Sequence, residues 1–240
     1  MDAILASAKL TVSLRITGVR DDGYHLIDAE MVSLDLYDTL ELSEGDSLEI
    51  VGPDRAQLLG DEHENLVRRA LELCGRTAQV RLHKQIPAGA GLGGGSADAA
   101  AVLRWAGYTD LNGAAGIGAD VAFCLYGGRA RVTGMGEIVE PLPFVERSVT
   151  LLIPPVHCST REVYAAWDRL GGPVGDNGND LEPAALAVAP ELERWRDHLG
   201  DASGQRPRLA GSGSTWWVDG EHPGEGLLVA RTVPAARHPG

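Results

Sequence analysis

The stretch with the clearest chemical meaning is Pro87–Asp98, where five glycines fall within seven residues just before an alanine-rich segment. Glycine has no Cβ, so the backbone N–H groups of such a loop can close around a bulky anion. The helix predicted to follow, with Ser96 as its cap, adds unpaired N–H groups and the positive end of a helix dipole. Loop and helix start together predict a phosphate-binding cradle. The alternative is a flexible linker or a tight turn, which the position of the loop between a predicted strand and a predicted helix disfavours.

Known classes of phosphate-binding loop have distinct sequence signatures. A Gly-x-Gly-x-x-Gly spacing begins at Gly89, as in dinucleotide-binding folds, but Pro87 interrupts the passage from strand to loop. The acidic residue expected about 20 positions later in that fold is not convincingly placed. A P-loop ends in Gly-Lys-Ser or Gly-Lys-Thr, whereas this loop ends in Gly95-Ser96 without a lysine. The His-Arg-Asp and Asp-Phe-Gly elements of protein kinases do not occur. The loop therefore fits none of these three classes.

Other residues that could take part in catalysis or binding lie far from the loop in sequence. Lys9 stands beside small residues at the start of a predicted strand, and Asp120 stands among small residues just before an apolar run. A lone lysine is usually a surface charge, and an aspartate at such a position often caps a helix or closes a turn. A polar turn also ends on two ring side chains, Tyr24 and His25. None of these residues has an assigned role without further context.

Periodicity predicts the elements that must position these residues. Alternating apolar positions indicate a strand-rich first third, expected to form an antiparallel sheet, and an apolar spacing of three to four residues indicates helices. Trp216 and Trp217, which follow a second glycine-serine run, are interpreted as packing residues rather than a platform for a nucleobase. The predicted strands are 10–16, 31–36, 39–42, 47–51, 77–85, 129–133, 148–153 and 216–218, and the predicted helices are 64–76, 96–105, 160–170 and 182–199.

Length, charge and cysteine content narrow the class of protein. The 240 residues suffice for one large domain or two small ones, with an ordinary 44% of hydrophobic residues. A net charge of −13 argues against a nucleic-acid-binding protein, which would normally carry a basic face. Three widely spaced cysteines suggest neither a disulfide framework nor a zinc site. No apolar run is long enough to cross a membrane, and the first residues read as a strand rather than a signal peptide, so we expect a cytoplasmic protein without membrane partners.

Together, these segments resemble the superfamily of galactokinase, homoserine kinase, mevalonate kinase and phosphomevalonate kinase, which shares the long glycine loop. Ala8-Lys9-Leu10, followed by Asp22-Gly23-Tyr24-His25, is similar to the 4-diphosphocytidyl-2-C-methyl-D-erythritol kinase family within it. Matches continue in the family's order over roughly residues 7–218, in the segments 64–67, 118–121, 179–182 and 211–214.

The resemblance implies an α+β, two-lobed small-molecule kinase fold with the active site between the lobes. The N-terminal, ATP-binding lobe (1–145) would be similar to ribosomal protein S5, and the C-terminal, substrate lobe (146–240) would be ferredoxin-like. The implied activity is ATP-dependent phosphorylation of the 2-hydroxyl of the cytidine-diphosphate-linked methylerythritol, in the non-mevalonate route to isoprenoids. The implied cofactors are ATP and Mg²⁺, and family members are often monomers or weak homodimers.

The resemblance also implies roles for individual residues. Lys9 and Asp120 match the catalytic pair, in which Asp120 accepts or orients the acceptor hydroxyl and Lys9 stabilises the developing charge. Tyr24 and His25 match residues that hold the cytidine end of the substrate, and Thr11 and Thr160 would line the substrate pocket. Ser96 would contact Mg²⁺, and Asn65 would approach the adenine. ATP phosphates would lie on Pro87, Ala88, Gly89, Ala90, Gly91, Leu92, Gly93, Gly94, Gly95, Ser96 and Ala97.

Some features depart from the family pattern. Thr11 stands where the family usually has asparagine, and the interval between Asp98 and Asp120 is shorter than expected by about three helical turns. The part after Trp217 also lacks an expected helix. Three readings therefore stay open: the kinase named above, a homoserine- or mevalonate-type kinase, and a catalytically inactive nucleotide-binding relative. The Tyr24-His25 pair favours the first, because the other two kinases have no cytosine to hold.

Overall fold

The computed structural model describes residues 2–52 and 65–235 of the chain. The predicted helix 64–76 is present as α2 (Leu66–Leu73), although Glu64 itself lies outside the described residues. The far end of the C-terminal tail, residues 236–240, also lies outside them. Across the two described ranges, no helix combines the length and the apolar composition needed to span a membrane.

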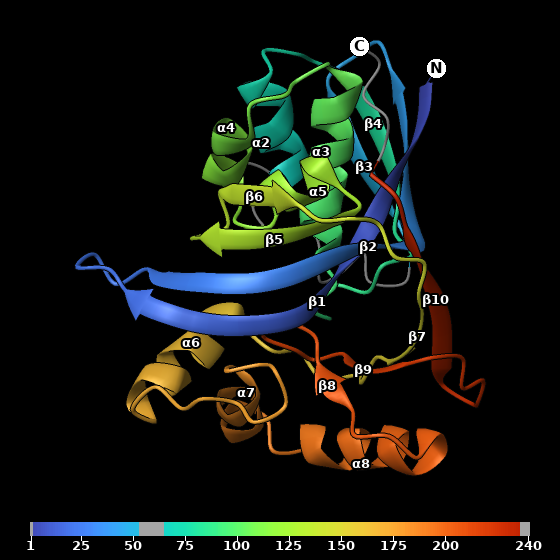
Figure 1. Cartoon of the computed structure of the whole chain (residues 1–240). Helices are drawn as coiled ribbons and strands as arrows, with labels where there is room; N and C mark the ends of the chain where they lie inside the picture. Colours follow the sequence, from blue (N-terminus) through green and yellow to red (C-terminus); the bar gives the residue numbers. More distant parts are fainter. Residues whose placement is uncertain (1, 53–64, 236–240) are drawn as a thin grey trace.

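A long antiparallel hairpin, β1 (Asp2–Val19) and β2 (His25–Ser43), runs across the middle of the molecule (Figure 1). The two predicted strands 31–36 and 39–42 are thus parts of one strand. The β1–β2 register shifts between Ser7 and Lys9 and again between Thr11 and Ser13. The stretch from Ala8 to Thr11 is buried on both faces, so the simple alternation predicted for 10–16 is wrong there. These irregularities lie at Lys9 and Thr11, two predicted site residues.

Within residues 2–52 and 65–235 the strands join into one ten-stranded sheet, and the β1–β2 pair of the strand-rich first third is antiparallel, as predicted. The exception in the first third is β3, which runs parallel to β4. Strands β6 and β10 were not predicted, and β10 connects the two halves of the molecule. It pairs with β7 along most of its length, and its last residues, Thr232 and Val233, pair with β2. The strand bounds are β3 Ser47–Val51, β4 Gln79–His83, β5 Arg129–Gly134, β6 Ile138–Pro141, β7 Ser148–Leu152, β8 Arg208–Leu209, β9 Trp216–Asp219 and β10 Leu227–Val233.

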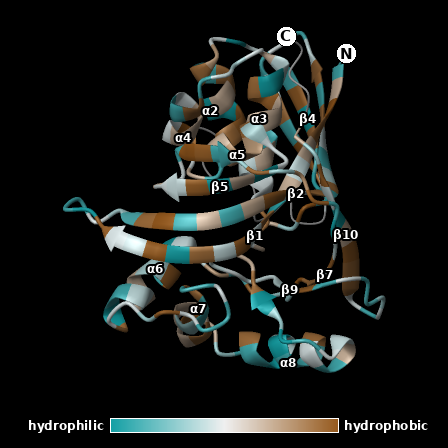
Figure 2. Cartoon of the chain, in the orientation of Figure 1, coloured by the Kyte–Doolittle hydropathy of each residue, from teal (hydrophilic) through white to brown (hydrophobic). Residues whose placement is uncertain are grey.

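The helices lie on two sides of the hairpin. Helices α2 to α5 lie on one side, and α6 to α8 lie on the other together with β8 and β9 (Figure 1). Helix α3 lies deep in the fold, with every residue from Ala97 to Leu103 buried, whereas only Leu192 and Leu199 of α8 are buried. Figure 2 shows hydrophilic residues along much of α8. The remaining helix bounds are α3 Gly94–Trp105, α4 Leu111–Ile117, α5 Val121–Tyr126, α6 Thr160–Arg169, α7 Glu182–Val188 and α8 Leu192–Ser203.

Two helix predictions need correction. The single helix predicted over 182–199 is two helices, because Pro190 lies between α7 and α8 and proline cannot continue a helical hydrogen-bond ladder. The helix after the glycine loop begins at Gly94, with Gly93 in the left-handed conformation as its N-cap and no side-chain cap. Ser96 is therefore not the cap but a residue of the first turn, where its hydroxyl remains available for another partner.

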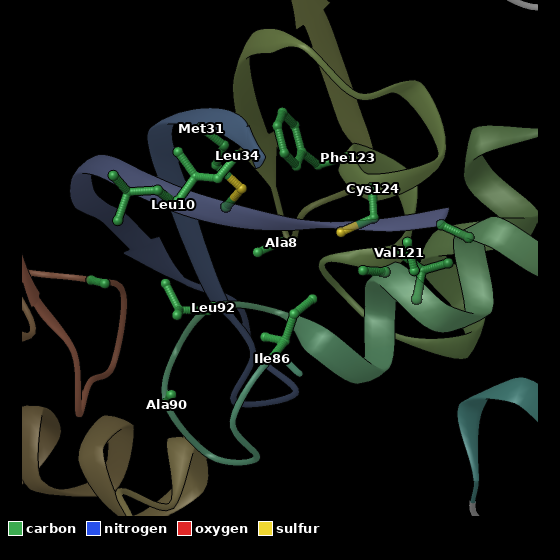
Figure 3. Packing of buried hydrophobic residues seen from close by; sticks show 14 of the residues in the cluster. Ala8, Leu10, Met31, Leu34, Ile86, Ala90, Leu92, Val121, Phe123 and Cys124 are labelled. Atoms are coloured by element: carbon green, nitrogen blue, oxygen red, sulfur yellow. The ribbon is translucent and has the colours of Figure 1, made fainter. Parts of the chain in front are cut away.

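The core extends directly beneath the glycine loop. Ile86, Ala90 and Leu92 are at most 3% exposed and belong to the same core cluster as the apolar residues of β1 and β2 (Figure 3). Because these three apolar side chains are buried, the intervening glycines are held at the surface of the cleft. The prediction for Trp216 and Trp217 is confirmed, since both are fully buried in the core.

Candidate active site

A single large cleft of about 1050 Å³ brings together residues that the sequence places far apart. Its walls come from β1, the β1–β2 turn, the glycine loop, the start of α5, helix α6 and the second glycine-serine run. Most of the predicted site residues line it. They are Lys9, Thr11, Tyr24, His25, Pro87, Ala88, Gly89, Ala90, Gly91, Leu92, Gly93, Gly94, Gly95, Ser96, Asp120 and Thr160.

The glycine loop is fixed by backbone bonds to both halves of the molecule. Lys9 N–H donates to the carbonyl of Leu92 at 2.9 Å, and Thr215 N–H donates to the carbonyl of Ala90 at 3.2 Å. A Cβ on Gly91 would lie 2.5 Å from the carbonyl oxygen of Ala210, and one on Gly93 would lie 2.7 Å from Cγ of Lys9. Both glycines also have positive φ. Only glycine fits at these two positions, where the loop packs tightly against its neighbours.

The loop ends in the first turn of α3, whose N–H groups have no acceptor within the helix. Gly94, Gly95 and Ser96 form this turn, and all three line the cleft. The turn therefore offers a set of donors and a positive helix end to an anion in the cleft.

Lys9 and Asp120 form an ion pair within the cleft. Lys9 Nζ lies 3.1 Å from Asp120 Oδ2 and also donates to Thr11 Oγ1 at 3.1 Å. The lysine side chain is 6% exposed and the aspartate side chain 32% exposed, so the carboxylate is the member that a molecule in the cleft can reach. Asp120 stands at the N-cap position of α5 but makes no side-chain cap bond. The interpretation of Asp120 as a helix cap is therefore wrong. The interpretation of Lys9 as a surface charge is also wrong.

The second glycine-serine run forms the wall behind this pair. Gly211 approaches Lys9 so closely that a Cβ there would lie 3.5 Å from Nζ. Asn179 holds the run in place, donating from Nδ2 to the carbonyls of Leu209 and Gly211 at 2.9 and 2.7 Å. Ser212 Oγ lies 3.0 Å from Oγ1 of Thr160, the first residue of α6.

Aromatic side chains gather at another part of the cleft. The His25 ring lies 4.7 Å from the Tyr164 ring and 5.5 Å from the Trp167 ring, centroid to centroid. Its Nε2 lies 2.8 Å from Asp168 Oδ1. Burial raises the pKa of Tyr164, which keeps its phenol neutral. Tyr24 is 62% exposed and lines the same cleft, so its ring is free to cover a planar ligand beside His25.

Asn65 and Ala97 are the predicted residues that the structure does not bring to the wall of the cleft. Asn65 caps α2, its Oδ1 accepting from Val67 N–H at 2.9 Å, and the next residue, Leu66, lines the cleft instead. Ala97 is buried behind the first turn of α3. In residues 2–52 and 65–235, no group of three or more histidine, cysteine, aspartate or glutamate side chains is placed to hold a metal ion.

The cleft residues that sequence reasoning missed include Tyr164 and Lys84. Tyr164 carries a usable signal, because it stands four residues after Thr160 on a predicted helix and so shares its face. Lys84 carries no such signal, because a lysine just before Pro87 would be interpreted as a surface charge. In the structure its side chain is only 4% exposed.

Comparisons with known proteins identify the family to which the chain is similar. Residues 65–128 match the model of the GHMP kinases N terminal domain. A 4-diphosphocytidyl-2-C-methyl-D-erythritol kinase of Paracoccus denitrificans is 40% identical over 88% of this chain and 84% of its own length. One from Cereibacter sphaeroides is 35% identical over 97% of this chain and 100% of its own length.

Solved structures extend the comparison. A crystal structure of 4-(cytidine 5'-diphospho)-2C-methyl-D-erythritol kinase, 28% identical, superposes over 96% of this chain and 99% of its own length with a TM-score of 0.75. A homoserine kinase from Cytophaga hutchinsonii, 20% identical, superposes over 98% of this chain and 96% of its own length with a TM-score of 0.60. At that identity the second similarity concerns the fold alone.

Proposed function

The chain belongs to the 4-diphosphocytidyl-2-C-methyl-D-erythritol kinase family, and from this premise we propose that it transfers the γ-phosphoryl group of ATP to the 2-hydroxyl of that family's cytidine-diphosphate-linked substrate. The observation that carries the proposal is the Lys9–Asp120 ion pair, which lines the same cleft as the glycine loop and the His25 pocket. The groups proposed to hold the phosphate donor, to act on the acceptor hydroxyl and to recognise the acceptor thus line one cleft.

The glycine loop is proposed to hold the ATP phosphates. The N–H groups of Gly94, Gly95 and Ser96 would donate to phosphate oxygens. Mg²⁺ at such sites takes few protein ligands and keeps several waters. The Ser96 hydroxyl, on the cleft and not used as a cap, fits that role. The ion would neutralise charge on the phosphates when bound.

Asp120 is the proposed partner of the acceptor hydroxyl. In phosphoryl transfer the hydroxyl oxygen forms a bond to the γ-phosphorus, the bond from that phosphorus to the bridging oxygen breaks, and ADP leaves. The hydroxyl proton passes to the accessible carboxylate of Asp120 as the new bond forms. The ammonium of Lys9, held by Thr11, offsets negative charge that develops beside Asp120.

The cytidine end is proposed to lie at the aromatic part of the cleft. Tyr24 would stack on the cytosine ring, and His25, oriented by Asp168, would hydrogen-bond its edge. Thr11 and Thr160 supply hydroxyls between that end and the ion pair. The assembly is proposed to be a monomer or a weak homodimer.

Release of ADP with a panel of alcohols tests the function. The full chain is incubated with ATP, Mg²⁺ and either the cytidine-diphosphate-linked methylerythritol, homoserine or mevalonate. We expect turnover with the first alone. Turnover with homoserine or mevalonate only would overturn the substrate assignment, and ATP binding without turnover on any acceptor would instead identify an inactive relative.

A further inference from the structure

The turn between β5 and β6 forms a part of the cleft wall to which the proposed function assigns no role. The cleft is lined there by Met135, Gly136 and Glu137, and Asp120 lines the same cleft. The turn belongs to the sheet and is separate in the chain from the glycine loop. What it contributes to the cleft is therefore independent of the phosphate cradle.

The turn is packed against the backbone that carries Asp120. Gly136 is buried and has a φ of 119°. A Cβ on it would lie 2.5 Å from the carbonyl oxygen of Ala119, the residue before Asp120. Only glycine permits this approach. Glu137, the next residue, therefore lies on the part of the wall nearest to the proposed partner of the acceptor hydroxyl.

The same turn also contacts the hairpin turn at the aromatic part of the cleft. Arg20 Nη1 lies 3.0 Å from Met135 Sδ, and its Nη2 donates to Asp22 Oδ2 at 2.7 Å. Asp22 Oδ1 in turn accepts from Tyr24 N–H at 3.3 Å. The β5–β6 turn thus extends from Asp120 toward Tyr24. It borders the stretch of the cleft that the polyol part of the acceptor would occupy if the cytidine lies at the aromatic part.

The carboxylate of Glu137 keeps an oxygen that the fold does not use. Its Oε2 accepts from Met135 N–H at 2.6 Å. In residues 2–52 and 65–235, Oε1 has no hydrogen-bond partner and the side chain is paired with no cation. Glu140, on the neighbouring β6, is instead paired with Arg131. A carboxylate can accept several hydrogen bonds, so Oε1 is available to a donor in the cleft.

Holding the turn together does not require this charge. A neutral amide would accept from Met135 N–H as well, and the carboxylate adds negative charge near Asp120 without a cation to offset it. Hydrogen bonds to a carboxylate are, however, roughly twice as strong as those to a neutral acceptor. The proposed acceptor is a polyol, whose hydroxyls are donors of this kind. A polyol in the cleft therefore accounts for the carboxylate better than the turn does.

We propose that Glu137 is an acceptor-binding residue, whose Oε1 accepts hydrogen bonds from hydroxyls of the polyol other than the one that is phosphorylated. Glu137 thereby selects a polyol over an acceptor that lacks those hydroxyls. This inference deepens the proposed function, and it rests on that function only in requiring that the cleft takes a cytidine-diphosphate-linked polyol.

Affinity for two ligands tests the role. Isothermal titration of the full chain, without ATP or Mg²⁺, would measure Kd for the cytidine-diphosphate-linked methylerythritol and for cytidine diphosphate, which lacks the polyol. Glu137→Gln keeps an oxygen for Met135 N–H but places an amide NH₂ where Oε1 was. We expect this variant to raise Kd for the polyol ligand about five- to twenty-fold and to leave Kd for cytidine diphosphate within about two-fold.

Glu140→Gln is the matched control, because Glu140 lies on the same hairpin but is paired with Arg131. It should change neither Kd. Equal weakening of both ligands by Glu137→Gln would show that the residue only shapes the turn. Unchanged affinity for the polyol ligand would show that Oε1 binds no hydroxyl. Either result would overturn the role of Glu137.

A ligand-side comparison keeps the inference testable if Glu137→Gln fails to fold. The unaltered chain is titrated with the cytidine diphosphate ester of ethanol, which keeps the ester linkage but lacks the polyol hydroxyls. We expect this ester to bind at least about five-fold more weakly than the polyol ligand. Equal affinities for the two esters would overturn the role of Glu137.

The outcomes separate this inference from the proposed function, because binding is measured without turnover. The expected affinities without phosphorylation of the polyol by ATP would overturn the proposed function and support Glu137. Normal phosphorylation with affinities that Glu137→Gln leaves unchanged would overturn the role of Glu137 alone. A chain that binds no cytidine-diphosphate-linked ligand would overturn both.

Discussion

Lys9 and Asp120 approach to 3.1 Å across the cleft although one lies on the first strand and the other at the start of α5. The lysine is buried and bonded to Thr11, whereas the carboxylate is partly open to the cleft. A fixed cation beside an accessible carboxylate is an arrangement suited to accepting a proton from an alcohol while negative charge builds up nearby. The catalytic predictions concern this ion pair and the residues that hold it and the acceptor in place.

Removal of the carboxylate should abolish transfer but not nucleotide binding. For Asp120→Ala, we expect kcat to fall by about two to four orders of magnitude, because general base assistance is lost. The affinity for ATP should stay within a few-fold, since the loop N–H groups are untouched. Steady-state kinetics and calorimetric titration with ATP measure the two effects. Lost ATP binding with unchanged turnover per bound enzyme would show that Asp120 is structural.

Thr11 should matter through its hydroxyl. Thr11→Val keeps the shape but removes the acceptor of the Lys9 Nζ bond. One such bond to a charged group contributes about 1.5–3 kcal/mol, so kcat should fall by roughly one to two orders of magnitude. Thr11→Ser keeps the hydroxyl and is the matched control. Equal kcat in the valine and serine variants would rule out a role for this hydrogen bond.

An alanine at Gly93 should reduce activity because its methyl group would contact Lys9, in addition to the backbone strain of a positive φ. Gly93 and Gly107 both have positive φ, at 68° and 74°, so alanine strains both by about 1 kcal/mol. Only at Gly93 does the new Cβ meet Lys9, 2.7 Å from its Cγ, whereas Gly107 has nothing within 4 Å. We expect Gly93→Ala to lower kcat by at least about ten-fold and Gly107→Ala to lower the melting temperature alone. Similar kcat in both variants would contradict this account.

Asp168 should affect the KM for the acceptor and not the KM for ATP. It contacts His25 Nε2 at 2.8 Å and so fixes which ring nitrogen faces the cleft. Asp168→Ala should raise KM for the cytidine-linked acceptor by about ten-fold while KM for ATP stays the same. Initial-rate measurements with each substrate varied in turn give this split. Parallel increases in the two KM values would indicate a general loss of structure.

The stability of the chain should depend on pH through Asp98. The folded pKa of Asp98, which burial raises to about 8, is above its ordinary value of 3.8, so the folded state holds this proton more tightly than the unfolded state. The stabilising contribution is complete below about pH 4 and is lost as pH rises through about 8. Between pH 5 and pH 9, the free energy of unfolding of Asp98→Asn, measured in urea, should therefore rise relative to that of the unaltered chain. A constant difference between the two chains would contradict the assigned protonation.

The sequence predicted which residues line the cleft better than it predicted the contacts that support them. The glycine loop could be found from its own residues, whereas Lys9 and Asp120 were singled out only through the resemblance of their segments to a known family, and the structure brings all three into one cleft. The burial of Lys84 could not be found, because its partners are 46 and 14 residues away in the chain. A contact between distant segments leaves no local periodicity.

The same reasoning explains the errors in the predicted strands and helices. Strand β10 begins after a polar segment, and most of its residues pair with β7, so its own residues gave a weak signal. The break between α7 and α8 was visible as Pro190, but the apolar spacing on either side concealed it. The β1 bulges at Lys9 and Thr11 depend on the partner strand and could not be read from β1 alone.

The most direct test of the central claim is ³¹P NMR of a reaction containing the full chain, ATP, Mg²⁺ and the cytidine-diphosphate-linked methylerythritol. We predict that a new phosphomonoester signal grows in step with ADP, that the diphosphate signals of the acceptor persist, and that mass spectrometry places one added phosphate on the acceptor. ADP accompanied only by inorganic phosphate, or no loss of ATP above the level of Asp120→Ala, would contradict the assignment of this cleft as a phosphoryl-transfer site for that alcohol.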